Sequence, residues 1–251
     1  MRDWNEDNHA YIANHPCLTG VLAVMEFMKK VRILQKEAGK DYTVIPIVMA
    51  EDISSAFESI DHVLIGEVLD CVYNLEGDFR LKDTIMSYLD RESWIIDRKT
   101  QEKAKLEKTY VDKTSPQGST LSPALWRIYD GIFTHMYKKE LVRLKEKTKC
   151  IIDVFHVAYA DDHVTIVVIK VKRTECVQKT KSRIKIIAET CRGLLDAATK
   201  AAGCGINPSR NASYLRSTPM NKRESRRRGL SGWDTASKWL MTVKLCSPVR
   251  S

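Results

Sequence analysis

The chain has 251 residues, of which 43% are hydrophobic and 29% are charged, so its composition is that of a globular protein and excludes a disordered one. Its formal net charge of +9 suits a nucleic-acid partner, because Lys and Arg gain affinity by releasing counterions from phosphates. No apolar run approaches the ~20 residues of a membrane span, and no apolar N-terminal core suggests a signal peptide. The seven cysteines are scattered, odd in number and without metal-ligand spacing. We therefore expect reduced thiols in an intracellular protein of the nucleus or cytoplasm, not secreted and without a membrane partner.

The N-terminal part of the chain predicts a helix, a buried strand and a second helix. Apolar residues recur at helical spacing from Cys17 to about Glu37, and Gly39 interrupts the pattern. The β-branched and apolar run at 44–50 predicts a buried strand that ends at Glu51-Asp52. Asp61 is the expected N-cap of the next helix. A carboxylate at the end of a buried strand can meet acids on a neighbouring strand, which makes Asp52 a candidate metal ligand.

A polar segment from Ser115 to Pro123 then enters a third predicted helix. Gly118 permits a close backbone approach that a side chain would block. Ser122 before Pro123 predicts a hydroxyl N-cap with proline in the first turn, and the helical pattern continues to about Lys145. Taken alone, this segment is a loop that enters a helix.

Two adjacent acids, Asp161-Asp162, lie between two β-branched runs within residues 154–168 and predict a hairpin with the acids at its tight turn. A solvated turn is one interpretation. The other is a divalent cation, the usual reason for two like charges to stand side by side. His163, beside the acid pair, could tune the site, but we expect it to be exposed beyond the turn. A long amphipathic helix, or alternatively a coiled-coil arm, follows from about Thr174 to Ala202 and ends at Gly203.

Three of these segments resemble motifs A, B and C of reverse transcriptases, in the same order along the chain. Their amino-acid sequences are most similar to those of the non-long-terminal-repeat retrotransposon group, of the Jockey and I-element type. The three segments are Asp52 to His62 (DISSAFESIDH), Ser115 to Pro123 (SPQGSTLSP) and Tyr159 to Asp162 (YADD). Weaker similarity extends to Tyr88–Arg91 and to a motif D at Gly205–Arg210, so that the resemblance covers roughly residues 15 to 215.

The resemblance implies an RNA-directed DNA polymerase with the α+β fold of a right-hand polymerase palm. Such a palm has a small antiparallel sheet with helices on one face, here with part of the fingers. It implies three regions, namely 1–40 as partial fingers and entry helix, 41–220 as the palm with motifs A to D, and 221–251 as a basic linker and incomplete C-terminal segment. We expect a fragment of a truncated retroelement polymerase, with missing segments supplied by a longer chain.

Individual roles follow from the same resemblance. Asp52, Asp161 and Asp162 would hold two Mg²⁺ ions, or Mn²⁺, for nucleotidyl transfer to a primer 3′-end. Phe57 would be the steric gate that excludes a ribose 2′-hydroxyl, with an ordinary core aromatic as the alternative. The other implied contacts are the nucleotide site (Gln117 and Gly118), the primer or template (Tyr159 and Ser119) and the leaving group (Arg210). Arg210 stands where relatives usually carry Lys, and because Arg stays protonated it would donate a proton poorly.

The expected partners are an RNA template, a DNA primer and deoxynucleoside triphosphates. A basic cluster near the C-terminal end is a nucleic-acid contact, a nuclear-import signal or a solvated loop. It comprises Lys222, Arg223, Arg226, Arg227 and Arg228. Two alternative functions stay open, a catalytically dead remnant that binds nucleic acid and a polymerase similar to group II intron maturases.

Overall fold

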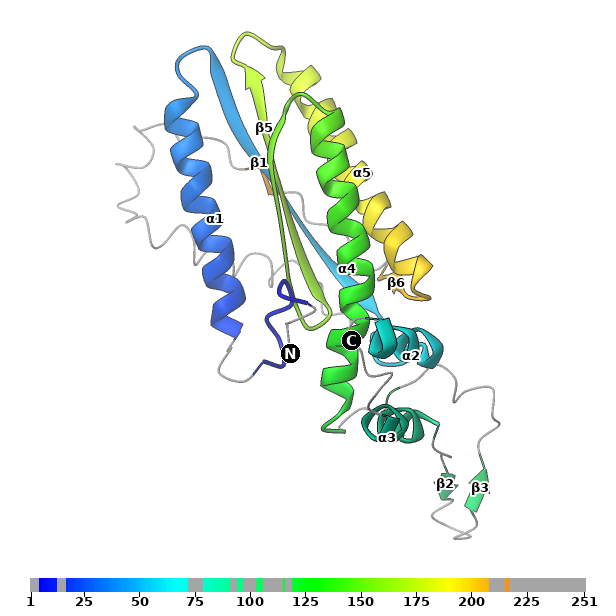
Figure 1. The fold of residues 1–251 in the computed structure, drawn as a ribbon. Helices are drawn as coiled ribbons and strands as arrows, with labels where there is room; N and C mark the ends of the chain where they lie inside the picture. The colour runs from blue at the N-terminus through cyan, green and yellow to red at the C-terminus, as the bar shows by residue number, and fades with distance from the viewer. Residues whose placement is uncertain are drawn as a thin grey trace.

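The computed structural model describes residues 5–12, 17–71, 79–90, 94–96, 103–105, 115, 119–207 and 215–216. A long antiparallel sheet lies between helix α1 on one side and helices α4 and α5 on the other (Figure 1). The predicted α+β class is confirmed. The elements in chain order are α1 (Cys17–Glu37), β1 (Tyr42–Ser54), α2 (His62–Cys71), α3 (Phe79–Leu89), β2 (Trp94–Ile96), β3 (Lys103–Lys105), α4 (Ser122–Lys147), β4 (Ile151–Tyr159), β5 (Asp162–Lys172), α5 (Val177–Ala201), β6 (Gly205–Ile206) and β7 (Leu215–Arg216).

The main sheet is built around β1, the longest strand. The strand order in this sheet is β4-β5-β1-β6, and β7 also pairs with β1. The β1–β5 ladder runs antiparallel from Tyr42 opposite Lys172 to Asp52 opposite Asp162. Strands β2 and β3 form a separate antiparallel pair. The predicted hairpin is therefore present, and its turn lies beside the end of β1.

One face of the sheet packs against α4 and α5. Side chains in the odd-numbered positions of β1 point to this face and are buried there, together with large aromatic residues of α4. They include Ile45, Ile47, Met49 and Ile53 from β1 and Trp126, Tyr129 and Phe133 from α4. Full burial of an aliphatic or aromatic side chain of this size contributes about 1.5–3 kcal/mol. This layer is the main hydrophobic core.

The other face of the sheet packs against α1. Phe27 of α1 stacks on Phe155 of β4 with ring centroids 4.7 Å apart, and Val31 is buried against Val44. The prediction that helices cover one face is corrected here, because α1 covers the second face. The physical reason is that β1 and β5 are apolar at odd and even positions alike, so each face needs a cover.

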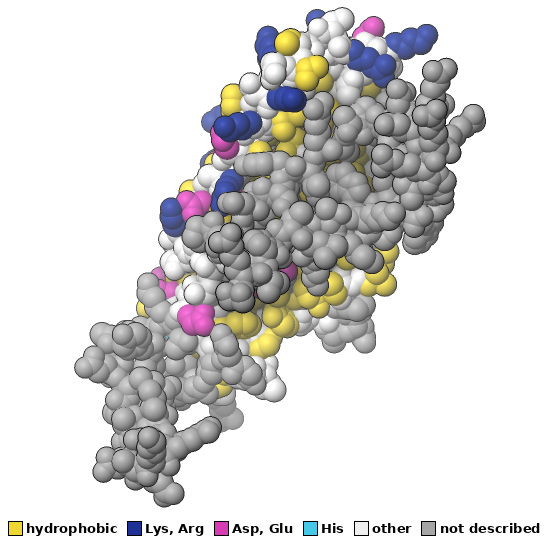
Figure 2. Space-filling model, turned by 180° about the vertical axis from the view of Figure 1, so that it is seen from behind, with side chains coloured by type: hydrophobic (Ala, Val, Ile, Leu, Met, Phe, Trp, Pro, Cys, Tyr) yellow, Lys and Arg dark blue, Asp and Glu magenta, His cyan; other side chains and the backbone are white. Residues whose placement is uncertain are grey.

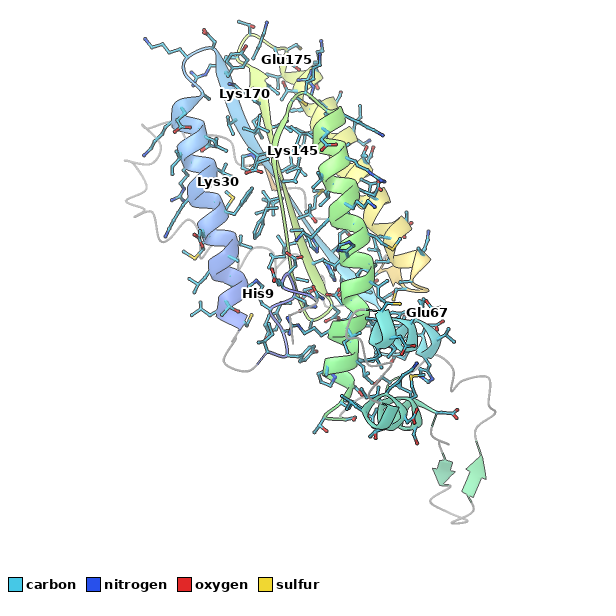
Figure 3. All side chains as sticks on the ribbon, viewed as in Figure 1. His9, Lys30, Glu67, Lys145, Lys170 and Glu175 are labelled. Atoms are coloured by element: carbon cyan, nitrogen blue, oxygen red, sulfur yellow. The ribbon has the colours of Figure 1, made fainter. Side chains whose placement is uncertain are left out.

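Both helix layers are tied to the edge strand β4 through Asp153. Lys30 of α1 lies 2.6 Å from one carboxylate oxygen and Lys145 of α4 lies 3.4 Å from the other (Figure 3). Desolvation opposes ionisation of this group, but the hydrogen bond and charge of Lys30 prevail, so the pKa of Asp153 is lowered. Asp153 thus links α1, the sheet and α4.

The predicted helix boundaries are mostly confirmed. Helix α1 has the expected bounds, and Gly203 follows α5 with a φ of +80°. Asp61 caps α2, since its Oδ1 accepts hydrogen bonds from the backbone N–H groups of Val63 and Leu64. Ser122 is not an N-cap. It is the first residue of α4, and its hydroxyl instead accepts a hydrogen bond from Ser115 Oγ at 2.6 Å.

The six cysteines within the described residues are free thiols. None of the described helices is both long enough and apolar enough to cross a membrane.

Candidate active site

The candidate site lies where β1, β4 and β5 come together at one end of the sheet. Tyr159 and Asp162 pair across a two-residue turn formed by Ala160-Asp161, and we call residues 159–162 the acidic turn. Asp52 lies directly opposite Asp162 in the β1–β5 ladder. The carbonyl of Asp161 accepts a hydrogen bond of 3.0 Å from the N–H of Ile53. Residues opposite each other in an antiparallel pair share a face, so Asp52 and Asp162 project to the same side.

The three acids differ in their surroundings. Asp52 is buried, with 8% of its surface exposed, whereas Asp161 is half-buried and Asp162 is exposed. Asp52 Oδ2 accepts a hydrogen bond of 3.0 Å from Asn207 Nδ2, and the Asp52 carbonyl accepts one of 2.9 Å from the Asn207 backbone N–H. Asn207 was not predicted as a site residue, although it lies within the segment that resembles motif D. Its amide fixes the orientation of the Asp52 carboxylate.

The donor chemistry fits a divalent cation, because carboxylate oxygens are the ligands that Mg²⁺ prefers. Among the residues that the structure describes, however, no three His, Cys, Asp or Glu side chains converge on one point. The backbone therefore brings the three acids to one end of the sheet without closing a three-ligand cluster. Their metal-binding role stays a prediction.

The segment before α4 meets the segment after β1. The backbone N–H of Ser115 donates a hydrogen bond of 2.9 Å to the carbonyl of Phe57. The Phe57 ring is half-buried, and its centroid lies 6.2 Å from that of the Trp126 ring. Phe57 therefore packs against the core and is partly exposed to solvent. Ser119 Oγ accepts a hydrogen bond from the Tyr88 hydroxyl. The predicted steric-gate role of Phe57 and template role of Ser119 are untested by these contacts.

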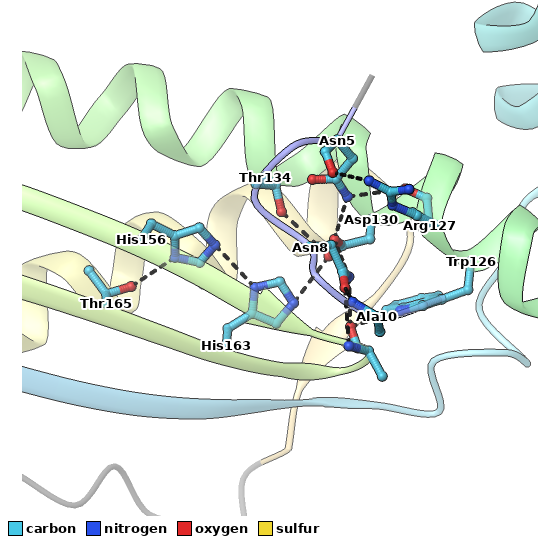
Figure 4. A network of polar contacts seen from close by, with 11 residues as sticks. Asn5, Asn8, Ala10, Trp126, Arg127, Asp130, Thr134, His156, His163 and Thr165 are labelled. Carbon is cyan, nitrogen blue, oxygen red and sulfur yellow. Dashed lines mark hydrogen bonds and ion pairs between the residues drawn. The ribbon is translucent and has the colours of Figure 1, made fainter. Parts of the chain in front are cut away.

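Behind the acidic turn, α4 contributes a buried polar network (Figure 4). His163 has 1% of its surface exposed, so the prediction of an exposed histidine is wrong. The reason is strand alternation: Asp162 points to one face and His163 to the other, toward α4. His163 Nε2 lies 3.1 Å from a carboxylate oxygen of Asp130, a fully buried acid that sequence reasoning missed. An acid on the apolar face of the predicted helix was the available signal.

Glu51, next to Asp52 on the strand, also points to the α4 and α5 face. It is buried, and neither carboxylate oxygen has a hydrogen-bond partner among the residues that the structure describes. Arg192 Nε lies 3.7 Å away and favours the charged form, but desolvation by burial is stronger and raises the pKa of Glu51. Glu51 and Asp52 are thus adjacent acids in different environments.

Tyr11 lies near two residues of the acidic turn, Tyr159 and Asp161. Tyr159 is half-buried, and Tyr11 has 45% of its surface exposed with a φ of +62°. Desolvation, followed by the negative charge of Asp161 and the nearby Tyr159, raises the pKa of Tyr11. A neutral phenol therefore lies near the acidic turn.

Several predicted contact residues lie outside the described residues. They are Gln117, Gly118, Arg210, Lys222, Arg223, Arg226, Arg227 and Arg228. Of the surface that is described, one face carries Lys and Arg side chains along a long edge, interspersed with Asp and Glu (Figure 2).

Most of the chain matches one known protein family. The profile of the family described as "Reverse transcriptase (RNA-dependent DNA polymerase)" matches residues 19–191. No curated protein matches the chain.

Among solved structures, a telomerase from Candida tropicalis in complex with a fragment of telomeric RNA matches with a TM-score of 0.49 and 13% identity, over 79% of this chain and 30% of that one. An apo telomerase from the same organism, truncated from its C-terminal domain, matches with a TM-score of 0.46 and 13% identity, over 79% of this chain and 36% of that one. This chain spans about a third of the length of those structures. Because the profile covers more than half of the residues, the chain belongs to the reverse transcriptase (RNA-dependent DNA polymerase) family.

Proposed function

We propose that this chain is a polymerase domain that copies RNA into DNA, joining deoxynucleoside triphosphates to the 3′-end of a primer annealed to an RNA template. The main support is the register of the sheet, in which Asp52 lies opposite Asp162 while Asp161 occupies the adjacent turn. Membership of a family described as RNA-dependent DNA polymerases supports the same reaction. The formal net charge of +9 suits a nucleic-acid partner.

Asp52, Asp161 and Asp162 would hold the divalent cations, Mg²⁺ or in its place Mn²⁺. When bound in such sites, these ions stabilise the attacking and leaving oxygens of a phosphoryl transfer. Mg²⁺ is commonly held by one or two carboxylates and completes its shell with water and substrate phosphates. This mode of binding is compatible with acids that lie at one end of the sheet but, among the described residues, do not form a three-ligand cluster.

The chain's own residues would bind and orient the reactants. Asn207 holds the Asp52 carboxylate in one orientation. Phe57, half-buried beside Trp126, would oppose a ribose 2′-hydroxyl, and Tyr159 would lie near the primer end. None of these roles requires a proton from the protein.

The test is primer extension on a poly(rA)/oligo(dT) duplex with Mg²⁺ or Mn²⁺. We expect extension by the wild type and none by Asp161→Asn, with the fold of the variant intact by circular dichroism. Asp153→Asn is the matched control, because it neutralises an acid of the same hairpin remote from the acidic turn. Full activity of Asp161→Asn would refute the assignment. Tight binding of the duplex without extension by any variant would point instead to a remnant that only binds nucleic acid.

We also propose the finer assignment to a non-long-terminal-repeat retroelement. It is supported by the wording of the three segments at 52–62, 115–123 and 159–162. Enzymes of that group are expected to extend the 3′-end exposed at a nick in duplex DNA. Extension of annealed primers but never of nicked duplex would leave the polymerase in place and argue against this subtype.

A further inference from the structure

A short N-terminal segment, residues 5–12, lies against the acidic turn although it is about 150 residues away in sequence. The N–H of His9 donates to the carbonyl of Ala158 at 3.0 Å, and the N–H of Ala158 donates to the carbonyl of Asp7 at 2.8 Å. These bonds place Asn8 beside β4 in a parallel bridge. The N-terminal segment is thus joined to β4 by a single parallel bridge next to the turn.

The side chain of Asn8 satisfies both polar backbone groups of Ala160. Its Oδ1 accepts a hydrogen bond of 3.2 Å from the Ala160 N–H, and its Nδ2 donates one of 3.0 Å to the Ala160 carbonyl. Trp126 Nε1 donates a second bond of 3.0 Å to the same carbonyl. Ala160 is the residue immediately before Asp161, so these bonds act on the turn that carries the acids.

Ala160 needs such support because its φ is +57°. A residue with a Cβ atom in this left-handed region is disfavoured by about 1–2 kcal/mol. A glycine would relieve the strain, but it would also let the turn adopt other conformations. Here the contacts of Asn8 and Trp126 hold an alanine in one conformation, and with it the direction of the next residue.

Asp130 holds Asn8 in place. This fully buried carboxylate accepts hydrogen bonds of 2.7 Å from both Asn8 Nδ2 and Asn5 Nδ2, and its Oδ1 also lies 3.4 Å from Thr134 Oγ1. The same Oδ1 lies 3.1 Å from His163 Nε2, although this contact is poorly aligned for a hydrogen bond. Asp130 therefore reaches the turn on two sides (Figure 4).

The two contacts bracket the acid pair. One runs through Asn8 to the residue before Asp161, and the other runs through His163, the residue after Asp162. Beyond His163 a chain of polar contacts continues through the sheet's α4 face, with His163 Nδ1 3.3 Å from His156 Nε2 and His156 Nδ1 3.2 Å from Thr165 Oγ1. If His163 donates its Nε2 proton toward the carboxylate, each remaining ring nitrogen in this chain finds a complementary partner.

We propose that Asn8 and Asp130 are positioning residues, which fix the acidic turn so that Asp161 and Asp162 are held ready for the cation and substrate. The inference rests on the proposed function, since it assigns these residues to that site. Neither residue would touch the substrate. Partners that orient metal ligands from behind change metal affinity or activity by about 10–100-fold when removed.

The test compares Asn8→Ala with Lys138→Met in the full chain. Lys138 lies 2.7 Å from Asp7 of the same N-terminal segment, so its loss loosens the segment while Asn8 keeps its bonds to Ala160. In Asn8→Ala we expect at least a tenfold faster hydrogen exchange of the Ala160 amide and about 10–100-fold weaker Mn²⁺ binding by electron paramagnetic resonance. The kcat for primer extension should fall by a similar factor, with the KM for nucleotide within about twofold. Lys138→Met should leave all of these near wild type.

A second pair of variants tests the link to Asp130. In Asn8→Asp two carboxylates would face each other at 2.7 Å, and activity should fall further than in Asn8→Ala. Adding Asp130→Asn removes the repulsion between the two carboxylates, so the double variant should recover part of the kcat lost in Asn8→Asp; it should stay below wild type, because the new carboxylate cannot donate to the Ala160 carbonyl. Equal effects of Asn8→Ala and Lys138→Met on exchange, or no recovery in the double variant, would overturn the proposal. If the wild type neither binds Mn²⁺ nor extends primers, the proposed function fails, and the exchange of the Ala160 amide alone decides whether Asn8 holds the turn.

Discussion

The contact between Asn207 and Asp52 gives the sharpest test of the site that does not depend on turnover. The hydrogen bond joins Asn207 Nδ2 to the buried carboxylate at 3.0 Å, while the backbone bond between the same two residues is independent of the side chain. Replacing Asn207 by Ala removes one hydrogen bond to a charged group, worth about 1.5–3 kcal/mol. Because Asn207 is half-buried and water can partly replace it, we expect a loss of about 1.5 kcal/mol.

Asn207→Asp makes the opposite change at nearly the same volume. It would bring a second carboxylate to the 3.0 Å contact with Asp52. At this distance and an effective dielectric constant of about 20, the repulsion is roughly 5 kcal/mol, an upper limit because the side chains can rotate apart. The Asp variant should therefore be less stable than the Ala variant at neutral pH. Millimolar Mg²⁺ should restore more stability to Asn207→Asp than to the wild type, because a cation bound only by the folded state stabilises it.

Urea unfolding followed by circular dichroism, with and without Mg²⁺, measures both effects. Asn207→Ser, which keeps a small polar side chain, is the matched control and should lie between wild type and Ala. Equal losses for Ala and Asp, with no differential effect of Mg²⁺, would show that Asn207 does not hold the Asp52 carboxylate in solution.

Three further outcomes follow from the described contacts. Burial, followed by the electrostatic effects of His163 and Lys138, lowers the pKa of His156, so the unfolded chain takes up a proton below about pH 6.5 that the folded chain does not. The free energy of unfolding should then fall with decreasing pH by up to about 1.4 kcal/mol per pH unit, and His156→Gln should flatten this slope in pH-dependent urea unfolding. Asp153→Ala should lower stability by about 0.5–1 kcal/mol through loss of the Lys30 and Lys145 contacts, and less in high salt; a salt-independent loss would contradict this. Phe57→Val should raise ribonucleotide incorporation about tenfold relative to deoxynucleotides in single-nucleotide extension, whereas an unchanged ratio would assign Phe57 to the core alone.

Elements with strong periodicity could be predicted from the sequence. The helix at Cys17–Glu37 has its predicted bounds, and the hairpin with Asp161-Asp162 at its turn is present, because apolar spacing and turn residues are local signals. Strand β1 extends beyond its predicted limits, from Tyr42 to Ser54, since its ends are set by pairing with β5 and β6 rather than by its own residues. Asp61 was assigned correctly as a cap, whereas the hydroxyl of Ser122 is taken by Ser115, a tertiary contact that no local rule contains.

The buried network that supports the acids was harder to predict from the sequence. His163 could have been placed inside by counting alternate positions from buried Val167 and Ile169, which share its face. Asn8 was not predicted, because apart from a local hydrogen bond that its Oδ1 accepts from the Ala10 N–H, its partners lie 122 and 152 residues away in the chain. Polar residues that act through long-range hydrogen bonds lack the sequence periodicity by which apolar core positions can be predicted. The motif around the acids predicts them, but no motif marks the residues that hold them.

The alternation of the strands has a consequence for how the two halves of the site can be separated by experiment. Asp52 and Asp162 project from one face of the sheet, whereas Glu51 and His163, one residue before and after them, project from the other toward α4. We call the face from which Asp52 and Asp162 project the acid face. Any residue that acts through the buried network must therefore act through the backbone of the acidic turn, without touching a substrate on the acid face. Substitutions in the network should change kcat and metal affinity while sparing nucleotide KM, and substitutions on the acid face should change all of them. A network variant that altered nucleotide KM alone would mean that the two faces are not separated in this way.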